Sequence, residues 1–431
     1  TDKPSLISVK TIIGFGMPKQ GTNKAHSDAP GEDAVKETKR NLGWDENKTF
    51  HVPDEVYTHF HKAIENGEKV ESHWNELVTK YESSQGELGK DFAEVRKNEL
   101  PKDWENALPK FENVESKATR EYSGEVINAL ADVLPALIGG SADLTGSNKT
   151  QIDDSKGFQF GAYEQRNIHF GVREHAMSAA MTGMALYGSL IPFGGTFFCF
   201  SDYLRPTMRL ACLSEVQVIY VFTHDSIGLG EDGPTHQPVE QLASLRAIPG
   251  LFVVRPADAH ETAQAWKLAL IRNDAPTALI LSRHKVAVID TNKYASAEGL
   301  QKGAYILAEA ESGTPQVILI ATGSEIGLAL EAREILQREN VQTRVVSMPC
   351  TELFDEQDES YREQILPKSI TARVAIEAGV SQSWYKYVNA DDGAFVTLDR
   401  FGASSPAKKL FQEFGFTPEN IAEKAKSIVK K

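Results

Sequence analysis

One loop, directly after a strongly apolar run, concentrates titratable side chains. The stretch THDSIGLGEDGPTHQP, residues 223–238, contains two histidines, three carboxylates and three glycines. It follows VIYVF, which is typical of a buried strand, and precedes VEQLASLRAI, which is typical of a helix. In open α/β sheets, ligands bind at the carboxyl ends of the strands. The pattern therefore favours a binding or catalytic site, where glycines allow a ligand to approach the backbone closely.

Two other interpretations of this loop stay open on the residues alone. It could be a solvated connector whose polar groups cap helices, with Thr235 capping the helix that follows. It could also bind a metal, because histidine and aspartate are common ligands. The metal interpretation is the weaker one, since His224 and His236 flank a flexible loop and do not share a helix face at i, i+4.

A glutamate opens the next notable segment, FGVREHAMSAAM. Glu174 stands where a helix begins, and a carboxylate there stabilises the helix by about 0.5 kcal/mol, which is a sufficient explanation on its own. The residues of the helix are small and apolar on all sides, which predicts that it is buried, for example at a subunit interface. In such a setting Glu174 would have a raised pKa and could exchange a proton with a bound heterocycle.

Three further groups of residues are candidates for ligand binding. The aromatic run GGTFFCFSDYLRP, residues 194–206, predicts either core packing or a flat stacking pocket. The Gly/Ser loop GGSADLTGSN, residues 139–148, could bind an anion through backbone amides and hydroxyls, but it is not a Walker loop. Arg120 and Arg283 could clamp a phosphate, because guanidinium groups match phosphate oxygens, although a single arginine is more often a surface residue.

The segments that must position these residues alternate between apolar strands and helices. This alternation, from about residue 118 to 295, predicts an α/β fold with a parallel sheet. A second, smaller α/β unit follows, with PQVILIATGS, TRVVSMPC and ITARVAIEAG as strands. Near the start, SLISVKTIIG also has the pattern of a buried strand, so we expect the chain to be a piece of something longer. Residues 54–82 predict one or two amphipathic helices.

Composition excludes several classes of protein. The 431 residues carry a formal charge of −14, which argues against nucleic acid or an anionic membrane as the main partner. The three cysteines lie far apart without CxxC spacing, which fits a reducing compartment and no structural zinc. No apolar run approaches the roughly 20 residues that a membrane-spanning helix needs.

Taken together, these stretches resemble the transketolase family. IGGSADLTGSN, FGVREHAM, GGTFFCFSDYLRP, THDSIGLGEDGPTHQP, RPAD and DRFGAS occur in the family's order and at similar spacing. The resemblance implies four parts: residues 1–30 as the end of the diphosphate-binding domain, 31–117 as a connector, 118–295 as the pyrimidine-binding domain and 296–431 as the C-terminal domain. The family's Gly-Asp-Gly motif is absent, so we expect the chain to lack most of the diphosphate-binding domain.

The resemblance also implies an activity. Transketolases use thiamine diphosphate to move a two-carbon ketol unit from a ketose phosphate to an aldose phosphate, as in the pentose phosphate pathway or the Calvin cycle. The family match makes Glu174, His236 and His26 the catalytic residues. It assigns the substrate to Arg120, Ser147, His224, Asp232 and Arg283, and the cofactor to Asp143, Leu144, Glu174, Phe197, Phe200 and Tyr203.

Partners and alternatives follow from the same resemblance. We expect sugar phosphates as ligands, a homodimer in the cytoplasm, and Mg²⁺ or Ca²⁺ bound only through the missing amino-terminal domain, with no metal ligand here. The sequence departs from the family at Ser27, where glycine is frequent, and at His284, where glutamine is frequent. Two alternatives remain: a sister thiamine enzyme such as dihydroxyacetone synthase or deoxyxylulose phosphate synthase, or a non-catalytic module that binds the missing domain.

Overall fold

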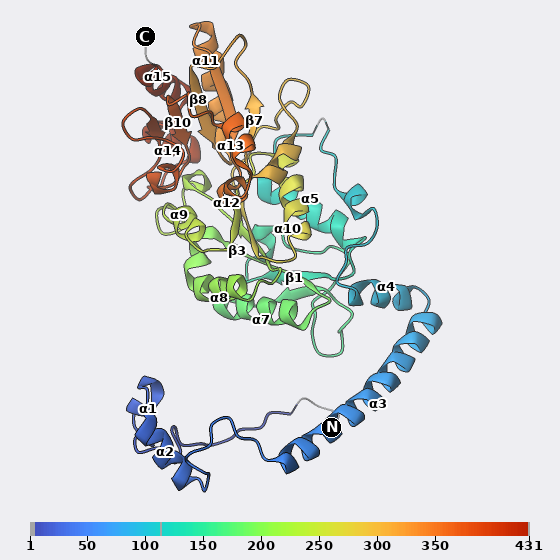
Figure 1. Ribbon diagram of the computed structural model, residues 1–431. Helices are drawn as coiled ribbons and strands as arrows, with labels where there is room; N and C mark the ends of the chain where they lie inside the picture. The colour runs from blue at the N-terminus through green and yellow to red at the C-terminus, as the bar shows by residue number, and fades with distance from the viewer. Residues whose placement is uncertain (1–4, 113, 430–431) are drawn as a thin grey trace. The chain divides into compact units, whose positions relative to one another are not determined.

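The computed structural model describes residues 5–112 and 114–429. They form two units, which divide between Gln85 and Gly86 (Figure 1). The first unit contains α1 (Lys24–Ser27), α2 (Glu32–Asn41) and α3 (Asp54–Ser84). The 31-residue helix α3 confirms the prediction of amphipathic helix in this region.

The strand predicted near the start of the chain is wrong. Residues 5–12 form no strand, and Leu6, Ile7 and Val9 are 96%, 83% and 73% exposed. A strand needs a neighbour to satisfy its backbone N–H and C=O groups. The described residues of the first unit contain no other strand that could pair with this segment.

A six-stranded parallel sheet forms the centre of the second unit, in the order β2-β1-β3-β4-β6-β5. Its strands are β1 (Leu137–Ser141), β2 (Asn167–His169), β3 (Ile191–Phe197), β4 (Ile219–Thr223), β5 (Phe252–Val254) and β6 (Thr277–Leu281). Every residue of β4 and β6 is buried, as expected for strands covered on both faces. The sheet confirms the predicted fold class.

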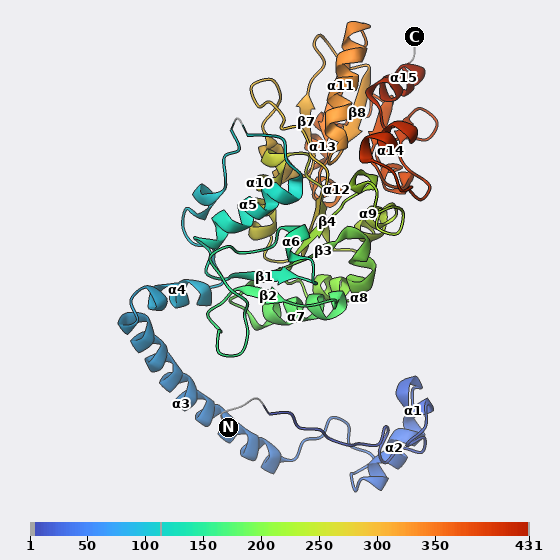
Figure 2. The ribbon, with the colours of Figure 1, turned by 180° about the vertical axis from the view of Figure 1, so that it is seen from behind.

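Helices cover both faces of this sheet. The helices of this part are α4 (Glu87–Arg96), α5 (Thr119–Ala131), α6 (Thr145–Asn148), α7 (Glu174–Tyr187), α8 (Ser201–Leu213), α9 (Gln241–Arg246) and α10 (Ala259–Ile271). On one face, Tyr122 of α5 and Trp266 of α10 belong to the core. On the other face, Met177 of α7 and Met208 of α8 do so. Figures 1 and 2 show these two layers on opposite sides of the strands.

A second sheet follows in the same unit, in the order β11-β10-β8-β9-β7. Its strands are β7 (Tyr305–Ala308), β8 (Val317–Ala321), β9 (Thr343–Ser347), β10 (Arg373–Ile376) and β11 (Ala394–Val396). Its helices are α11 (Glu325–Arg338), α12 (Thr351–Asp355), α13 (Glu359–Ile365), α14 (Ala407–Glu413) and α15 (Pro418–Ile428). The smaller α/β part is thus confirmed, although the antiparallel edge strand β7 was not predicted.

Buried polar groups join the parts built on the two sheets. Arg255, after β5, donates from Nη2 to Asp225 at 2.7 Å and also binds Glu325, the first residue of α11. Glu261 of α10 accepts hydrogen bonds from Tyr305 Oη at 2.8 Å and Ser347 Oγ at 2.6 Å. These six residues are at most 5% exposed. Removing Asp225 or Glu325 would leave the buried charge of Arg255 less compensated, so these contacts favour one docking arrangement.

Candidate active site at the carboxyl edge of the six-stranded sheet

Most of the predicted site residues come together at one edge of the six-stranded sheet. They follow β1, β3, β4 and β6, which are neighbours in the sheet, and carboxyl ends of parallel strands meet at one edge. The residues that follow these strands are Asp143, Leu144 and Ser147 after β1, Phe200 and Tyr203 after β3, His224, Asp232 and His236 after β4, and Arg283 after β6. Phe197 ends β3, and Arg120 and Glu174 lie in the first turns of α5 and α7.

Aromatic rings form one wall of this edge. Phe197 stacks on Phe200 with centroids 5.8 Å apart and planes 9° apart, and Phe200 lies 6.0 Å from Tyr203. His236 meets Phe200 edge-on at 5.6 Å. Phe198, in contrast, is fully buried in the core. The aromatic run is therefore divided: Phe198 packs in the core, and Phe197, Phe200 and Tyr203 lie next to one another at the sheet edge. That these three rings stack on a ligand stays a prediction.

His224 is held rigidly in this wall. Its ring stacks on Phe197 with centroids 3.7 Å apart, and its Nδ1 lies 2.8 Å from Thr223 Oγ1. Its φ of 63° is in the left-handed region, which is uncommon for a residue other than glycine. Burial, assisted by the charges of Arg120 and Arg283, lowers the pKa of His224 to about 3. The imidazole is therefore neutral at physiological pH.

Two arginines, Arg120 and Arg283, bring positive charge to this edge. Arg120 is half-buried and donates from Nη1 to the carbonyl oxygen of Ser147 at 2.7 Å. Burial and the charge of Arg283 both lower the pKa of Arg120. The Nε of Arg120 is buried without a partner among the described residues. Because an unpaired buried donor is costly, this arrangement suits an anionic ligand that would complete its bonds.

The loop between β4 and α9 combines ligand-facing and structural residues. Asp225 is 1% exposed and is bound to Arg255, so it acts as an anchor. Asp232 is exposed and His236 half-buried, so both remain accessible. Thr235 does not cap the following helix as predicted, because α9 begins only at Gln241. The Thr235 hydroxyl instead lies 3.0 Å from His236 Nδ1.

Residues from the C-terminal part support the same loop. Gln237 donates from Nε2 to the carbonyl oxygens of Gly230 and Ala403, both at 2.9 Å, and Ser404 Oγ donates to the Glu231 carbonyl at 2.6 Å. A Cβ on Gly402 would lie 1.8 Å from Gln237 Oε1, so a side chain there would displace the Gln237 amide that makes these bonds. This support was not predicted from the sequence, because it joins segments more than 160 residues apart.

The other predicted residues lie as follows. Glu174 is half-buried at the start of α7, and Asp143 is exposed with a φ of 62°. His26 lies exposed in α1 of the first unit, and its catalytic role stays a prediction. His284 packs its ring against Gly228 and lies 5.6 Å from Phe411 of α14.

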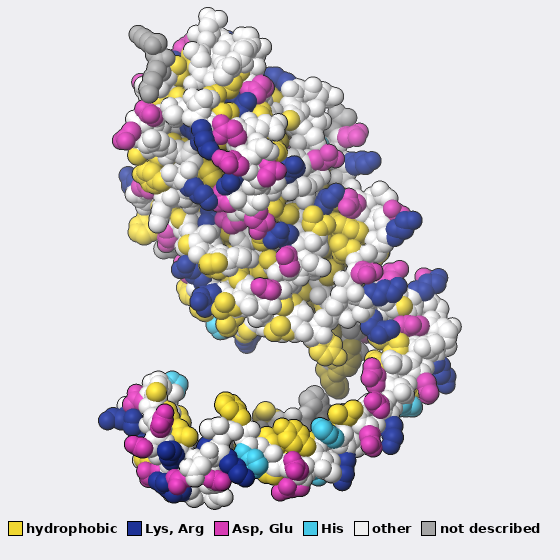
Figure 3. Space-filling model, in the orientation of Figure 1, with side chains coloured by type: hydrophobic (Ala, Val, Ile, Leu, Met, Phe, Trp, Pro, Cys, Tyr) yellow, Lys and Arg dark blue, Asp and Glu magenta, His cyan; other side chains and the backbone are white. Residues whose placement is uncertain are grey.

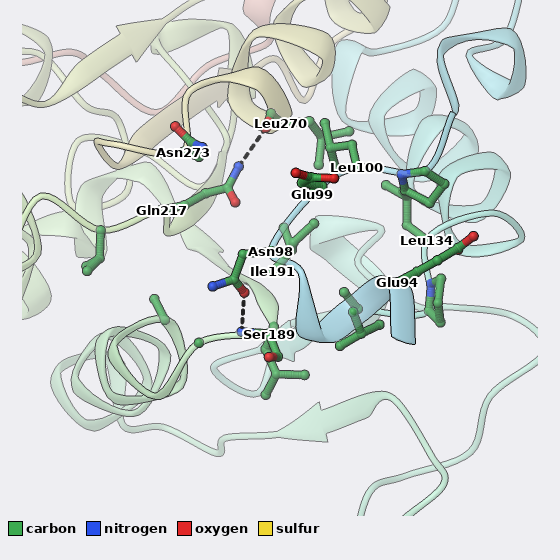
Figure 4. Close-up of a pocket in the computed structure, with 18 of the residues that line it drawn as sticks. Glu94, Asn98, Glu99, Leu100, Leu134, Ser189, Ile191, Gln217, Leu270 and Asn273 are labelled. Carbon is green, nitrogen blue, oxygen red and sulfur yellow. Dashed lines mark hydrogen bonds between the residues drawn. The ribbon is translucent and has the colours of Figure 1, made fainter. Parts of the chain in front are cut away.

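A separate cavity of about 500 Å³ lies at the amino ends of the strands (Figure 4). Its lining includes Glu94, Glu99 and Glu215 but no lysine, arginine or histidine. In Figure 4 the Gln217 amide bonds to Leu270 and the Asn98 amide to Ser189. Since this lining contains none of the predicted site residues, the cavity is distinct from the candidate active site.

Two negative findings apply to the described part of the chain. No group of three or more His, Cys, Asp or Glu side chains there is arranged to hold a metal ion. No helix among the described residues is long and apolar enough to cross a membrane.

Family models match three consecutive parts of the chain. Residues 1–101 match the transketolase thiamine diphosphate binding domain, residues 115–288 the transketolase pyrimidine binding domain, and residues 303–417 the transketolase-like C-terminal domain. The fold and these matches define the class: an α/β protein made of transketolase-type thiamine diphosphate binding, pyrimidine binding and C-terminal domains.

Individual relatives are equally consistent. The chain is 50% identical to the transketolase of Geobacillus stearothermophilus over 431 residues, which are 100% of this chain and 64% of that protein. It is 47% identical to the chloroplastic transketolase of Craterostigma plantagineum, over 99% of this chain and 82% of that protein. A Pichia stipitis transketolase solved with sedoheptulose 7-phosphate superposes with a TM-score of 0.92 at 39% identity, over 100% of this chain and 63% of that one. The chain belongs to the transketolase family.

The family matches correct the expectation about the diphosphate-binding domain, and the relatives show how much of their length the chain spans. The chain was expected to lack most of the diphosphate-binding domain and to need that missing domain as a partner. Both expectations are wrong as stated, because residues 1–101 match the model of that domain. The absence of a Gly-Asp-Gly motif was too narrow a criterion for the absence of the domain. The chain spans 61% and 64% of the lengths of the first two curated relatives.

Proposed function

We propose that this protein is a transketolase that transfers a two-carbon ketol unit from a ketose phosphate to an aldose phosphate. The observation that supports this most directly is the convergence of Arg120, Arg283, His224, Asp232 and His236 on one sheet edge. Guanidinium groups suit a phosphate, and a carboxylate and imidazoles suit sugar hydroxyls. Relatives in the family support the same ligands, since one was solved with sedoheptulose 7-phosphate.

The aromatic wall fits the ring system of thiamine diphosphate. Phe197, Phe200 and Tyr203 offer flat apolar surfaces for a heterocycle, and Glu174 supplies a half-buried carboxyl group at a helix start. When bound, this cofactor supplies a carbon nucleophile that carries the two-carbon unit. In this proposal Glu174 holds a proton at a ring nitrogen, and Asp143 and Leu144 lie beside the cofactor.

A divalent cation, Mg²⁺ or Ca²⁺, would accompany the cofactor's diphosphate. We assign it no ligands, because no suitable cluster occurs among the described residues.

The roles of the remaining residues follow from charge and position. The phosphate of the sugar is bound by Arg120, Arg283 and Ser147 of α6. Asp232 accepts a hydrogen bond from a sugar hydroxyl, and its exposure leaves it free to do so. His236 is a general acid–base that moves hydroxyl protons beside the reacting carbons. We propose the same acid–base role for His26, which lies exposed in α1.

We also propose that the protein is a homodimer joined through α7. One face of this helix exposes Ala176, Ala179, Ala180 and Gly183, together with Leu186 and Tyr187, which are 60% and 90% exposed. Leu210 and Leu213 of the neighbouring α8 are 54% and 64% exposed. Hydrophobic side chains are visible on the surface over these helices (Figure 3). Small and apolar residues together suit close packing against a second copy.

A substrate comparison tests the activity. The purified chain, supplied with thiamine diphosphate and Mg²⁺, should transfer a ketol unit from xylulose 5-phosphate to ribose 5-phosphate. Formaldehyde as acceptor and pyruvate as donor should give a much lower kcat/KM. Glu174→Gln should remove turnover, and the exposed Glu240→Gln should not. Equal or better use of formaldehyde would favour a dihydroxyacetone synthase. Equal or better use of pyruvate would favour a deoxyxylulose phosphate synthase.

A further inference from the structure

A chain of buried hydrogen bonds runs from the end of β3 to His224. Ser141 Oγ lies 2.7 Å from the Gly195 carbonyl oxygen, Asn148 Nδ2 lies 2.6 Å from Ser141 Oγ, and Thr223 Oγ1 lies 2.7 Å from Asn148 Oδ1. The last link is the 2.8 Å contact between Thr223 Oγ1 and His224 Nδ1. Ser141, Asn148 and Thr223 are at most 1% exposed, so no water is needed to complete the chain.

The direction of every link follows from the first one. A carbonyl oxygen can only accept, so Ser141 must donate its single proton to Gly195. Ser141 Oγ can then only accept from Asn148, which places the Asn148 amide nitrogen toward Ser141 and its Oδ1 toward Thr223. Thr223 must in turn donate to Asn148, and so can only accept from His224. The proton of the neutral imidazole therefore lies on Nδ1.

The reverse arrangement fails on a contact within the same chain. If Thr223 donated to His224, the Asn148 amide would have to be flipped, and Ser141 would have to donate to Asn148. The Ser141 and Gly195 oxygens would then lie 2.7 Å apart with no proton between them. Two acceptors at that distance repel, and an unsatisfied buried pair costs on the order of 1–3 kcal/mol.

A glycine leaves the space that these hydrogen bonds need. A Cβ on Gly195 would lie 2.8 Å from Thr150 Cγ2 and 3.1 Å from Asn148 Nδ2, so a side chain there would clash with Thr150 and crowd Asn148. Asn148 ends α6, which contacts β1, β3 and β4 (Figure 2). The His224 Nε2 has no hydrogen-bond partner among the described residues, and it is not among the fully buried unpartnered atoms.

We propose that Asn148 and Thr223 are positioning residues that fix the proton of His224 on Nδ1, so that its Nε2 accepts a hydrogen bond from a ligand hydroxyl. This inference rests on the proposed function for the identity of the ligand, a sugar phosphate. It excludes His224 as a hydrogen-bond donor to the phosphate, because an unprotonated nitrogen repels a fully ionised phosphate oxygen. Arg120 and Arg283 bind the charge, and His224 binds an O–H group, either P–OH or a sugar hydroxyl.

Nitrogen NMR of histidine-labelled protein tests the tautomer without any turnover. Couplings between the ring nitrogens and the carbon-bound ring protons show which nitrogen carries the proton. We expect His224 to be protonated on Nδ1 in the unmodified protein. Protonation on Nε2 would overturn the inference and leave the proposed function untouched, so the two can fail separately.

Variants test the positioning role. Thr223→Val keeps the shape of the side chain and removes the hydroxyl, so the Nε2-protonated form of His224 should rise at least tenfold. Thr223→Ser should restore the Nδ1-protonated form. The matched control is Thr235→Val beside His236, where the threonine is exposed. If Thr223→Val does not fold, the spectrum of the unmodified protein still decides the tautomer. If folded Thr223→Val keeps the same tautomer of His224, the positioning role of these hydrogen bonds is overturned.

Three probes at pH 6 distinguish the sources of the hydroxyl. Inorganic phosphate carries P–OH at this pH, sulfate carries no O–H group, and ribose carries only sugar hydroxyls. A shift of the His224 Nε2 signal with phosphate but not sulfate supports P–OH, and a shift with ribose supports a sugar hydroxyl. An equal shift with sulfate, or no shift with saturating phosphate and ribose, would overturn the acceptor role.

Discussion

At the residue scale, two consecutive side chains of the same loop have different roles, one toward a ligand and one in the core. His224 lies against the aromatic wall and is neutral because burial lowers its pKa to about 3. Asp225, the next residue, is turned into the core and neutralised by Arg255. The left-handed φ of His224 separates the two side chains. The loop therefore delivers a ligand group and an anchor from consecutive positions.

Arg120 provides the first prediction. Arg120→Ala should raise the KM for a phosphorylated acceptor about 10- to 100-fold, because a charge-assisted hydrogen bond contributes about 1.5–3 kcal/mol. kcat should change little, since the phosphate is remote from the reacting carbons. Steady-state kinetics with ribose 5-phosphate and with unphosphorylated ribose measure the effect.

The matched control is Arg166, another half-buried arginine that donates to backbone carbonyls, those of Ala131 and Leu134. Arg166→Ala should lower stability without a selective effect on phosphorylated acceptors. An equal increase in KM for ribose and ribose 5-phosphate in Arg120→Ala would contradict the phosphate role.

The sequence predicted which residues meet at the site better than how they are bonded. Strand ends and glycines were enough to place His224, Asp232 and His236 on one loop. The link from Asn148 to Thr223 spans 75 residues, and the pair between Arg255 and Asp225 spans 30. Such contacts depend on strand order, which a single sequence does not specify, so the hydrogen-bond chain behind His224 was not predicted.

At the element scale, apolar runs predicted strands wherever a neighbouring strand was available. VIYVF and TALIL became β4 and β6 because both faces of the sheet are covered by helices. SLISVKTIIG has a similar pattern but forms no strand among the described residues. An apolar pattern indicates that a segment can form a strand. Whether the strand forms depends on a neighbouring strand with which it can pair.

Glu261 of α10 provides a prediction at this scale. Burial, assisted by the charge of Asp258, raises the pKa of Glu261 to about 7 from its ordinary 4.5. The folded state therefore binds this proton more tightly than the unfolded state, so its contribution to stability is lost as pH rises from about 4.5 to about 7. Glu261→Gln should remove this loss and gain up to about 3 kcal/mol relative to the unmodified protein above pH 7.

Urea unfolding from pH 4.5 to 8 measures the difference. Glutamine can keep the contacts, because the Tyr305 and Ser347 hydroxyls can reverse and accept from its amide. Glu240→Gln, at an exposed position, is the control and should show no such trend. A difference between Glu261→Gln and the unmodified protein that is constant across this pH range would contradict the raised pKa.

At the scale of the whole molecule, Gly183 on the exposed face of α7 tests the dimer. A Cβ at Gly183 meets nothing within 4 Å, so Gly183→Glu costs the protomer nothing in packing and removes a flexible residue from a helix. A charged side chain at a tight helical interface would, however, be buried without a partner. We expect sedimentation velocity to show a shift from dimer to monomer.

Gly327→Glu is the matched control, since Gly327 is also a helical glycine with nothing within 4 Å of its Cβ position. It should leave the association state unchanged. A Gly183→Glu protein that sediments like the unmodified dimer would place the interface elsewhere.

The support that Ala403 and Ser404 give to the loop at 230–237 has a practical consequence. An engineer who sought a minimal protein would be inclined to discard everything after the first sheet, since all the proposed ligand groups of the larger unit precede residue 284. Such a trimmed chain would lose the contacts to Gln237 and Glu231, and also Glu325, the second partner of Arg255. The loop at 230–237 would lose its fixed conformation, so the substrate specificity of the shortened protein would not represent that of the intact one.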